Sequence, residues 1–179
     1  MAPVPPQYQA QPQTKKPNTA LIVIIILVSG FCLIVLIFAA ILFPVFSQAR
    51  LAASKSATLS EAKSISLALA MYAAEHDETM PASFMSTQDL RAAAEPYNNP
   101  GALTFLSKNP DGGEFLPNGL AEGLQMWRVV SPSEAILIYE SVPWKSDNSR
   151  VVGRFDVSAK FIKEFDETTM LQFEVAPEE

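Results

Sequence analysis

The chain has 179 residues and a formal net charge of −6, with one cysteine and one histidine. A single cysteine, Cys32, excludes an intrachain disulfide and a metal site built from several thiolates. Lys15 and Lys16 are two of the 13 basic residues, so 11 remain against all 19 acidic residues in residues 44–179. The resulting net charge of −8 disfavours nucleic acid and anionic lipid as the main partner of this region.

Residues 1–19 have the composition of a segment that cannot form a core. They are rich in Pro and Gln and contain no Leu, Ile or Phe. Such segments favour polyproline or disordered conformations because they have little apolar surface to bury. We predict a disordered tail over residues 1–19.

The next segment is a 24-residue run without a charge, from Ala20 to Phe43. As a helix it would be about 36 Å long, which exceeds the roughly 30 Å of a bilayer's hydrocarbon core. We therefore predict one transmembrane segment over residues 20–43, with membrane lipid as a partner. Cys32 lies inside it, where we expect a lipid-facing or helix-facing side chain.

The charges that flank this run do not decide its orientation. Lys15 and Lys16 precede it, and Arg50, Lys55 and Lys63 follow it, so the positive-inside rule gives no clear answer. The sequence Ser47-Gln48-Ala49 could be read as a signal-peptidase site. Because the apolar run is longer than the usual core of a signal peptide, we favour an uncleaved anchor.

The segment 44–81 has the pattern of an amphipathic helix that continues the span. Apolar side chains recur at spacings of three and four, and Pro44 can be carried as a kink. We expect nearly continuous helix from residue 20 to 77, ended by the acidic residues before Pro81. We further expect this helix to bind protein partners through one apolar stripe, formed by Leu59, Ala62, Ile65, Leu69 and Tyr72.

Residues 82–179 predict a loop-rich antiparallel β domain. Ser86 begins a capping box for a short helix that should end before Pro96. Turn residues dominate 98–123, with a short strand at 103–106. Strands are predicted at 135–139, at 150–155 and 159–165 as a hairpin, and at 170–175 as an edge strand. The fold class is α+β, a long helix packed on a small antiparallel sheet.

Several stretches of the chain resemble bacterial type IV pilin-like proteins, and most closely the pseudopilin-like family whose C-terminal domain has no known function. The resemblance lies in residues 39–50, 67–73 and 77–81, and more weakly in 132–140 and 151–161. It implies a pilin-like fold and an inner-membrane location with the C-terminal domain outside the cytoplasm. It also implies partners among self or other pilin-like subunits of type II secretion or pilus filaments.

The chain departs from this family at its processing site. Leu27 stands where members carry an acidic residue, and Ile22 stands where they carry the cleavage glycine. We therefore do not expect prepilin peptidase cleavage or ordinary filament assembly. Val157 and Ser158 replace a Gly and a His in the hairpin.

Catalytic and cofactor signatures are absent from the sequence, so we predict a protein that is not an enzyme and needs no cofactor. His76 is the one histidine, and we expect it to be an exposed helix-end residue. Carboxylate pairs could still act as acid and base in a hydrolase, and the candidates are Asp77 with Glu78 and Asp156 with Glu140.

Oxygen-rich turns and three aromatic residues are candidate metal and contact sites. Weak calcium candidates are Asn109, Asp111 and Glu114 beside Gly112, or Asp147 with Asn148, although ordinary turn chemistry is the favoured interpretation. Among the aromatic residues Trp127, Trp144 and Tyr139, we expect Tyr139 to fill the core. Trp144 is predicted to be a partner-contact anchor in a surface near residues 142–150.

These features predict a non-catalytic, single-pass inner-membrane protein that is a structural or accessory component of a secretion or pilus-type assembly. The alternative is a membrane-tethered module in which residues 82–179 bind a ligand or polysaccharide outside the cytoplasm.

Overall fold

The computed structural model describes residues 18–98 and 101–177, and contacts divide the chain into two units. Unit 1 ends at Ser47 and unit 2 comprises Gln48–Glu179. Most of the predicted tail over residues 1–19 lies outside the described residues.

The first element is the helix α1, which runs from Thr19 to Glu75 and contains Pro44. The prediction of nearly continuous helix over residues 20–77 is confirmed. Proline has no N–H to donate to the preceding turn, and the Ser47 hydroxyl donates to the Pro44 carbonyl over 3.1 Å. The helix nevertheless continues through Pro44 without a break.

The part of unit 1 from residue 22 to 47 is a stretch of α1 with mostly apolar, exposed side chains. Every residue from Ile22 to Ser47 is exposed, and the large apolar ones include Phe31, Phe43 and Phe46. Within the described residues, α1 is the one helix long and apolar enough to cross a membrane. An apolar surface on all sides of a helix is compatible with a single transmembrane span.

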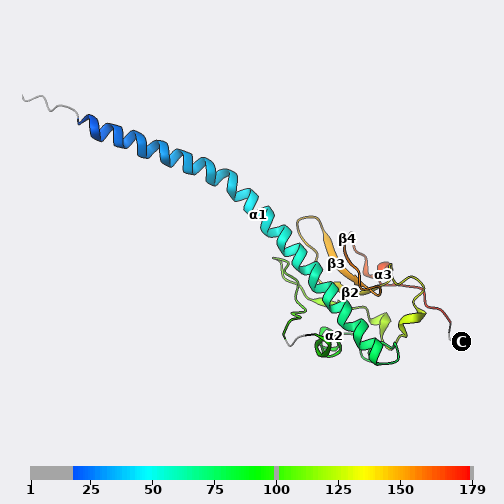
Figure 1. Cartoon of the computed structure of the whole chain (residues 1–179). Coiled ribbons are helices and arrows are strands. Elements are labelled where there is room, and N and C mark those ends of the chain that lie inside the picture. Colours follow the sequence, from blue (N-terminus) through cyan, green and yellow to red (C-terminus); the bar gives the residue numbers. More distant parts are fainter. Residues whose placement is uncertain (1–17, 99–100, 178–179) are drawn as a thin grey trace, which may run out of the picture. The chain divides into compact units, whose positions relative to one another are not determined.

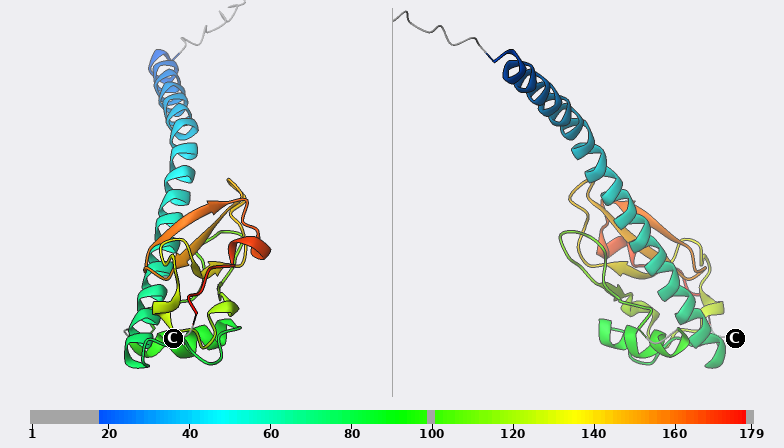
Figure 2. Two further views of the ribbon diagram at one scale, coloured as in Figure 1. Left: turned by 90° about the vertical axis from the view of Figure 1, so that its right-hand side faces the viewer. Right: turned by 60° about the vertical axis from the view of Figure 1, so that its left-hand side comes forward.

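Unit 2 contains a four-stranded antiparallel sheet in the order β1-β2-β3-β4. The strands are β1 (Phe115–Pro117), β2 (Ile136–Glu140), β3 (Ser149–Arg154) and β4 (Ala159–Lys163). Figures 1 and 2 show the unit 2 part of α1 across one face of this sheet. The α+β class and the strands predicted at 135–139, 150–155 and 159–165 are confirmed by β2, β3 and β4.

Both faces of the sheet are covered. Ala62, Ile65 and Leu69 of α1 have no exposed surface and share a core with Ile138 and Val151. On the opposite face, Ile136, Tyr139 and Val152 pack against C-terminal residues, namely Phe165, Met170 and Leu171. Tyr139 fills the core as predicted, and its burial raises the pKa of its phenol.

Helix α2 (Thr87–Ala94) begins as the sequence predicts. Ser86 accepts a hydrogen bond from the Asp89 N–H, and the Asp89 carboxylate accepts one from the Ser86 N–H in return. These bonds satisfy two amides that the first helical turn would leave unpaired. The α-helix ends before Pro96, and the 3-10 turn η1 (Glu95–Tyr97) follows.

The prediction of a strand at 103–106 is wrong. Only Leu106 forms a bridge, to Glu114, and Phe105 has a φ of 56°, which is outside the extended region. The edge strand in this part of the sheet is β1 instead, which pairs with β2. Two 3-10 turns follow, η2 (Gly119–Ala121) and η3 (Met126–Arg128).

The prediction of an edge strand at 170–175 is also wrong. A helical turn, α3 (Glu167–Met170), ends at the first residue of the predicted strand, and Asp166 caps this turn by accepting a hydrogen bond from the Thr168 N–H. Of the predicted strand, only Val175 forms a bridge, to Val129. Capping by Asp166 explains the helical turn up to Met170, and residues 171–174 form no strand in the structure.

Candidate functional site

The carboxylate of Glu140, at the end of β2, is a fully buried charged group of the sheet. Its side chain has no exposed surface. It accepts hydrogen bonds from the Trp144 Nε1–H over 2.9 Å, from the Val151 N–H over 3.1 Å and from the Ser107 hydroxyl. Three donors from separate segments compensate for the loss of water around the carboxylate.

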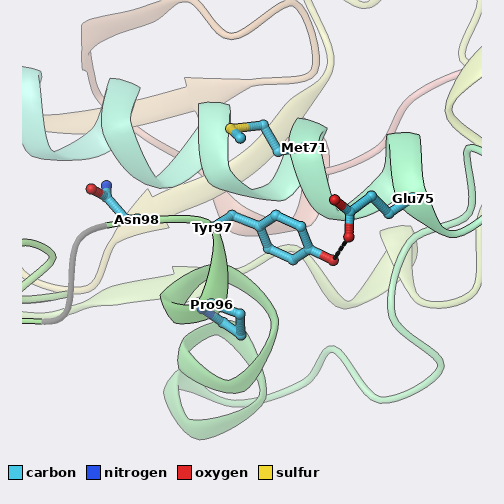
Figure 3. A pocket seen from close by; sticks show the side chains of 5 residues that line it. All are labelled: Met71, Glu75, Pro96, Tyr97 and Asn98. Carbon is cyan, nitrogen blue, oxygen red and sulfur yellow. Dashed lines mark hydrogen bonds between the residues drawn. The ribbon is translucent and has the colours of Figure 1, made fainter.

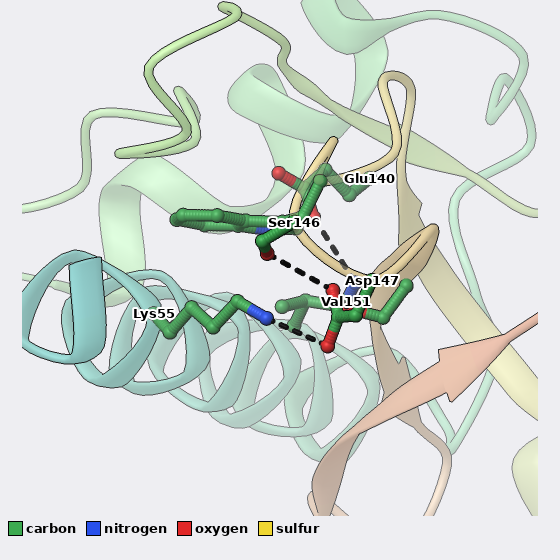
Figure 4. Close-up of polar contacts among 7 residues, drawn as sticks. Lys55, Glu140, Ser146, Asp147 and Val151 are labelled. Carbon is green, nitrogen blue, oxygen red and sulfur yellow. Dashed lines mark hydrogen bonds and ion pairs between the residues drawn. The ribbon is translucent and has the colours of Figure 1, made fainter. Parts of the chain in front are cut away.

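A second charged group lies beside this carboxylate, between α1 and the β2–β3 connection (Figure 4). Lys55 Nζ of α1 lies 2.8 Å from Asp147 Oδ2. The ammonium group also lies 5.5 Å from the ring centroid of Trp144 and 5.2 Å from that of Phe161. The hydrogen bonds from Lys55 and Ser149 lower the pKa of the Asp147 carboxyl to about 2.

Together these contacts form what we call the polar clasp, defined by Lys55, Ser107, Glu140, Trp144 and Asp147. It joins α1, the 107–113 loop and the β2–β3 connection through side-chain contacts. Each of these five side chains has a hydrogen-bond partner within the same chain, so the geometry of the clasp fits a structural role.

The prediction that Trp144 is an exposed contact anchor is wrong. Its side chain is 1% exposed. Its indole N–H is bonded to Glu140 and its ring lies edge-on to Phe161, with centroids 6.3 Å apart. The exposed tryptophan is Trp127, which is 53% exposed in η3.

The apolar stripe of α1 faces the chain's own core. Ala62, Ile65 and Leu69 are fully buried, and Leu59 and Tyr72 pack against the same cluster. This corrects the prediction that the stripe contacts a protein partner. The helical periodicity indicates a buried face but does not identify what covers it.

A groove of about 610 Å³ lies at the C-terminal end of α1 (Figure 3). It is lined by Met71, Glu75, Pro96, Tyr97 and Asn98. The Tyr97 hydroxyl donates to Glu75 Oε2 over 2.8 Å, and this bond raises the pKa of the Tyr97 phenol. The groove thus offers an aromatic ring, a thioether and a carboxylate to a bound molecule.

His76 lies next to this groove and is exposed, as predicted. Its ring stacks on Tyr72 with centroids 3.9 Å apart, and its Nδ1 lies 2.8 Å from the Tyr72 carbonyl oxygen. Because a carbonyl only accepts hydrogen bonds, Nδ1 carries the hydrogen in this arrangement. This contact stabilises the last turn of α1.

The structure separates Asp156 from Glu140. Glu140 ends β2, whereas the Asp156 N–H bonds to Pro132, which precedes the start of that strand. Five residues of extended strand span about 13 to 17 Å, too far for two carboxylates to act on one bond. Asp77 and Glu78 are exposed neighbours in a turn, with φ values of 54° and 56°.

The calcium candidates have other roles. Asn109 Oδ1 accepts from the Asp111 N–H and its Nδ2 donates to the Val142 carbonyl, while Asp111 pairs with Lys145. No group of three or more His, Cys, Asp or Glu residues within the described ranges could hold a metal ion. Hydrogen bonds and an ion pair within the chain account for the side chains of Asn109 and Asp111.

Comparisons with models of protein families, with curated proteins and with solved structures found no match.

The sequence did not indicate the clasp. Lys55 and Asp147 are 92 residues apart, and Ser107 and Glu140 are 33 apart. The one feature of the sequence that pointed to the clasp was Glu140, which follows an apolar strand. A Glu at this place can equally be exposed, so its position alone does not predict burial.

Proposed function

We propose that this chain is a non-catalytic, single-pass membrane protein, with a structural or accessory role in a secretion or pilus-type assembly. The observation that carries the proposal is α1, which combines a long exposed apolar segment with a stripe that completes the core of unit 2. A helix that serves both purposes is typical of a chain whose folded unit works while tethered to a membrane. The pilin-like resemblance of the sequence supports the same role.

The proposed location is the cytoplasmic membrane, with unit 2 outside the cytoplasm. Membrane retention can be tested by washing membranes that contain the full chain with alkaline carbonate. We expect the chain to stay in the pellet. Paired Leu33→Lys and Ile37→Lys changes should release it, because each lysine in mid-membrane costs about 2.5–3.5 kcal/mol.

A matched control is Leu106→Lys, which places the same charge at an exposed apolar residue of unit 2. This variant should remain in the pellet like the unchanged chain. Release of the unchanged chain by carbonate would contradict membrane insertion.

The assembly partner can be tested by photo-crosslinking in cells. Leu67 is 51% exposed on α1, so a photoreactive residue there can reach a neighbour without disturbing the core. We expect products that contain a subunit of a secretion or pilus-type assembly, with none from a probe at exposed Lys160 on β4. Identical products, or none, at both positions would contradict the proposal.

The groove at Tyr97 favours a second candidate function, a membrane-tethered module that binds a small ligand or polysaccharide. Saturation-transfer NMR on the detergent-solubilised full chain, with defined neutral and acidic oligosaccharides, tests this. Tyr97→Phe would keep the ring but lose the bond to Glu75, and Tyr97→Ala would lose both. A signal lost only in Tyr97→Ala would indicate stacking, whereas no signal with any probe would count against this candidate.

A further inference from the structure

We draw no further inference here: the strongest candidate, the apolar hollow of about 320 Å³ between α1 and η3 where exposed Trp127 lies beside Ala74, is an unpartnered face, and nothing in the described part of the chain shows what covers it.

Discussion

Lys55 of α1 and Asp147 of the β2–β3 connection form an ion pair of 2.8 Å between residues 92 positions apart. The side chains are 20% and 33% exposed, so water still screens the pair. The pair closes the polar clasp over the buried carboxylate of Glu140. Its contribution to stability should be modest but measurable.

The first prediction concerns this ion pair. Asp147→Asn should lower the free energy of unfolding by about 0.5–1 kcal/mol at neutral pH, after allowance for solvent screening. The folded state depresses the carboxyl pKa from 3.8 to about 2, so the stabilisation is present above pH 3.8 and is lost as the pH falls towards 2. Urea unfolding of the full chain in detergent, at neutral pH and near pH 2, measures both effects.

The control for this prediction is Lys145→Met, which removes the exposed pair with Asp111. Lys145 is 81% exposed, so stability should change by less than about 0.5 kcal/mol. Equal losses in Asp147→Asn and Lys145→Met would show that the Lys55 pair has no special role.

The second prediction concerns the buried carboxylate. Glu140→Gln keeps the size of the side chain, and its carbonyl can accept from the Trp144 and Val151 N–H groups, which both donate to Oε2. Its NH2 group then replaces the oxygen that accepts from the Ser107 hydroxyl. The unfolding free energy should fall by about 1–3 kcal/mol, because one acceptor is lost and the remaining hydrogen bonds no longer go to a charged group. Glu114→Gln, at a half-buried carboxylate of the same sheet region, should change it by less than about 0.5 kcal/mol. If Glu140→Gln left the free energy of unfolding unchanged, the clasp would be excluded as a stabilising feature.

The third prediction concerns the close approach of α1 to β3. A Cβ on Gly153 would lie 2.3 Å from Ser66 Oγ and 2.8 Å from Ile138 Cγ1. Gly153→Ala should therefore destabilise unit 2 by about 2 kcal/mol or more. Ser66→Ala alone should be neutral or stabilising, because the buried Ser66 hydroxyl has no hydrogen-bond partner.

The double variant Ser66→Ala with Gly153→Ala provides the matched test. It should be more stable than the sum of the single changes predicts, since the nearest obstructing atom is removed. If the changes in unfolding free energy of the two single variants simply add, α1 and β3 do not approach each other this closely.

The fourth prediction concerns the β3–β4 turn. Val157 has a φ of 66°, a conformation that β-branched residues rarely adopt. Val157→Gly should raise the free energy of unfolding by about 1 kcal/mol, because glycine adopts positive φ without a steric cost. Differential scanning calorimetry of the full chain should show a higher Tm. Val157→Ile, which keeps the branch, should give no gain, and a lower Tm for Val157→Gly would argue against the strained turn.

How much of this fold could be predicted depends on whether the determining contacts are local. The length of α1 and the Ser86 capping box depend on residues within four positions of each other, and both predictions were correct. The strand predicted at 170–175 is wrong at its first residue because Asp166 caps a helical turn that ends at Met170. Trp144 was misplaced because Phe161, which lies edge-on to its ring, becomes a neighbour only when the sheet forms, although Glu140, which accepts its N–H, is four residues away.

The most direct test of the central claim is the intact mass and peptide map of the chain extracted from native membranes. An uncleaved anchor predicts that residues 20–43 remain covalently attached to unit 2, with an intact mass near 19.5 kDa. A chain that begins at Arg50, after the Ser47-Gln48-Ala49 sequence, would mean release as a soluble domain and would contradict the proposed membrane tether.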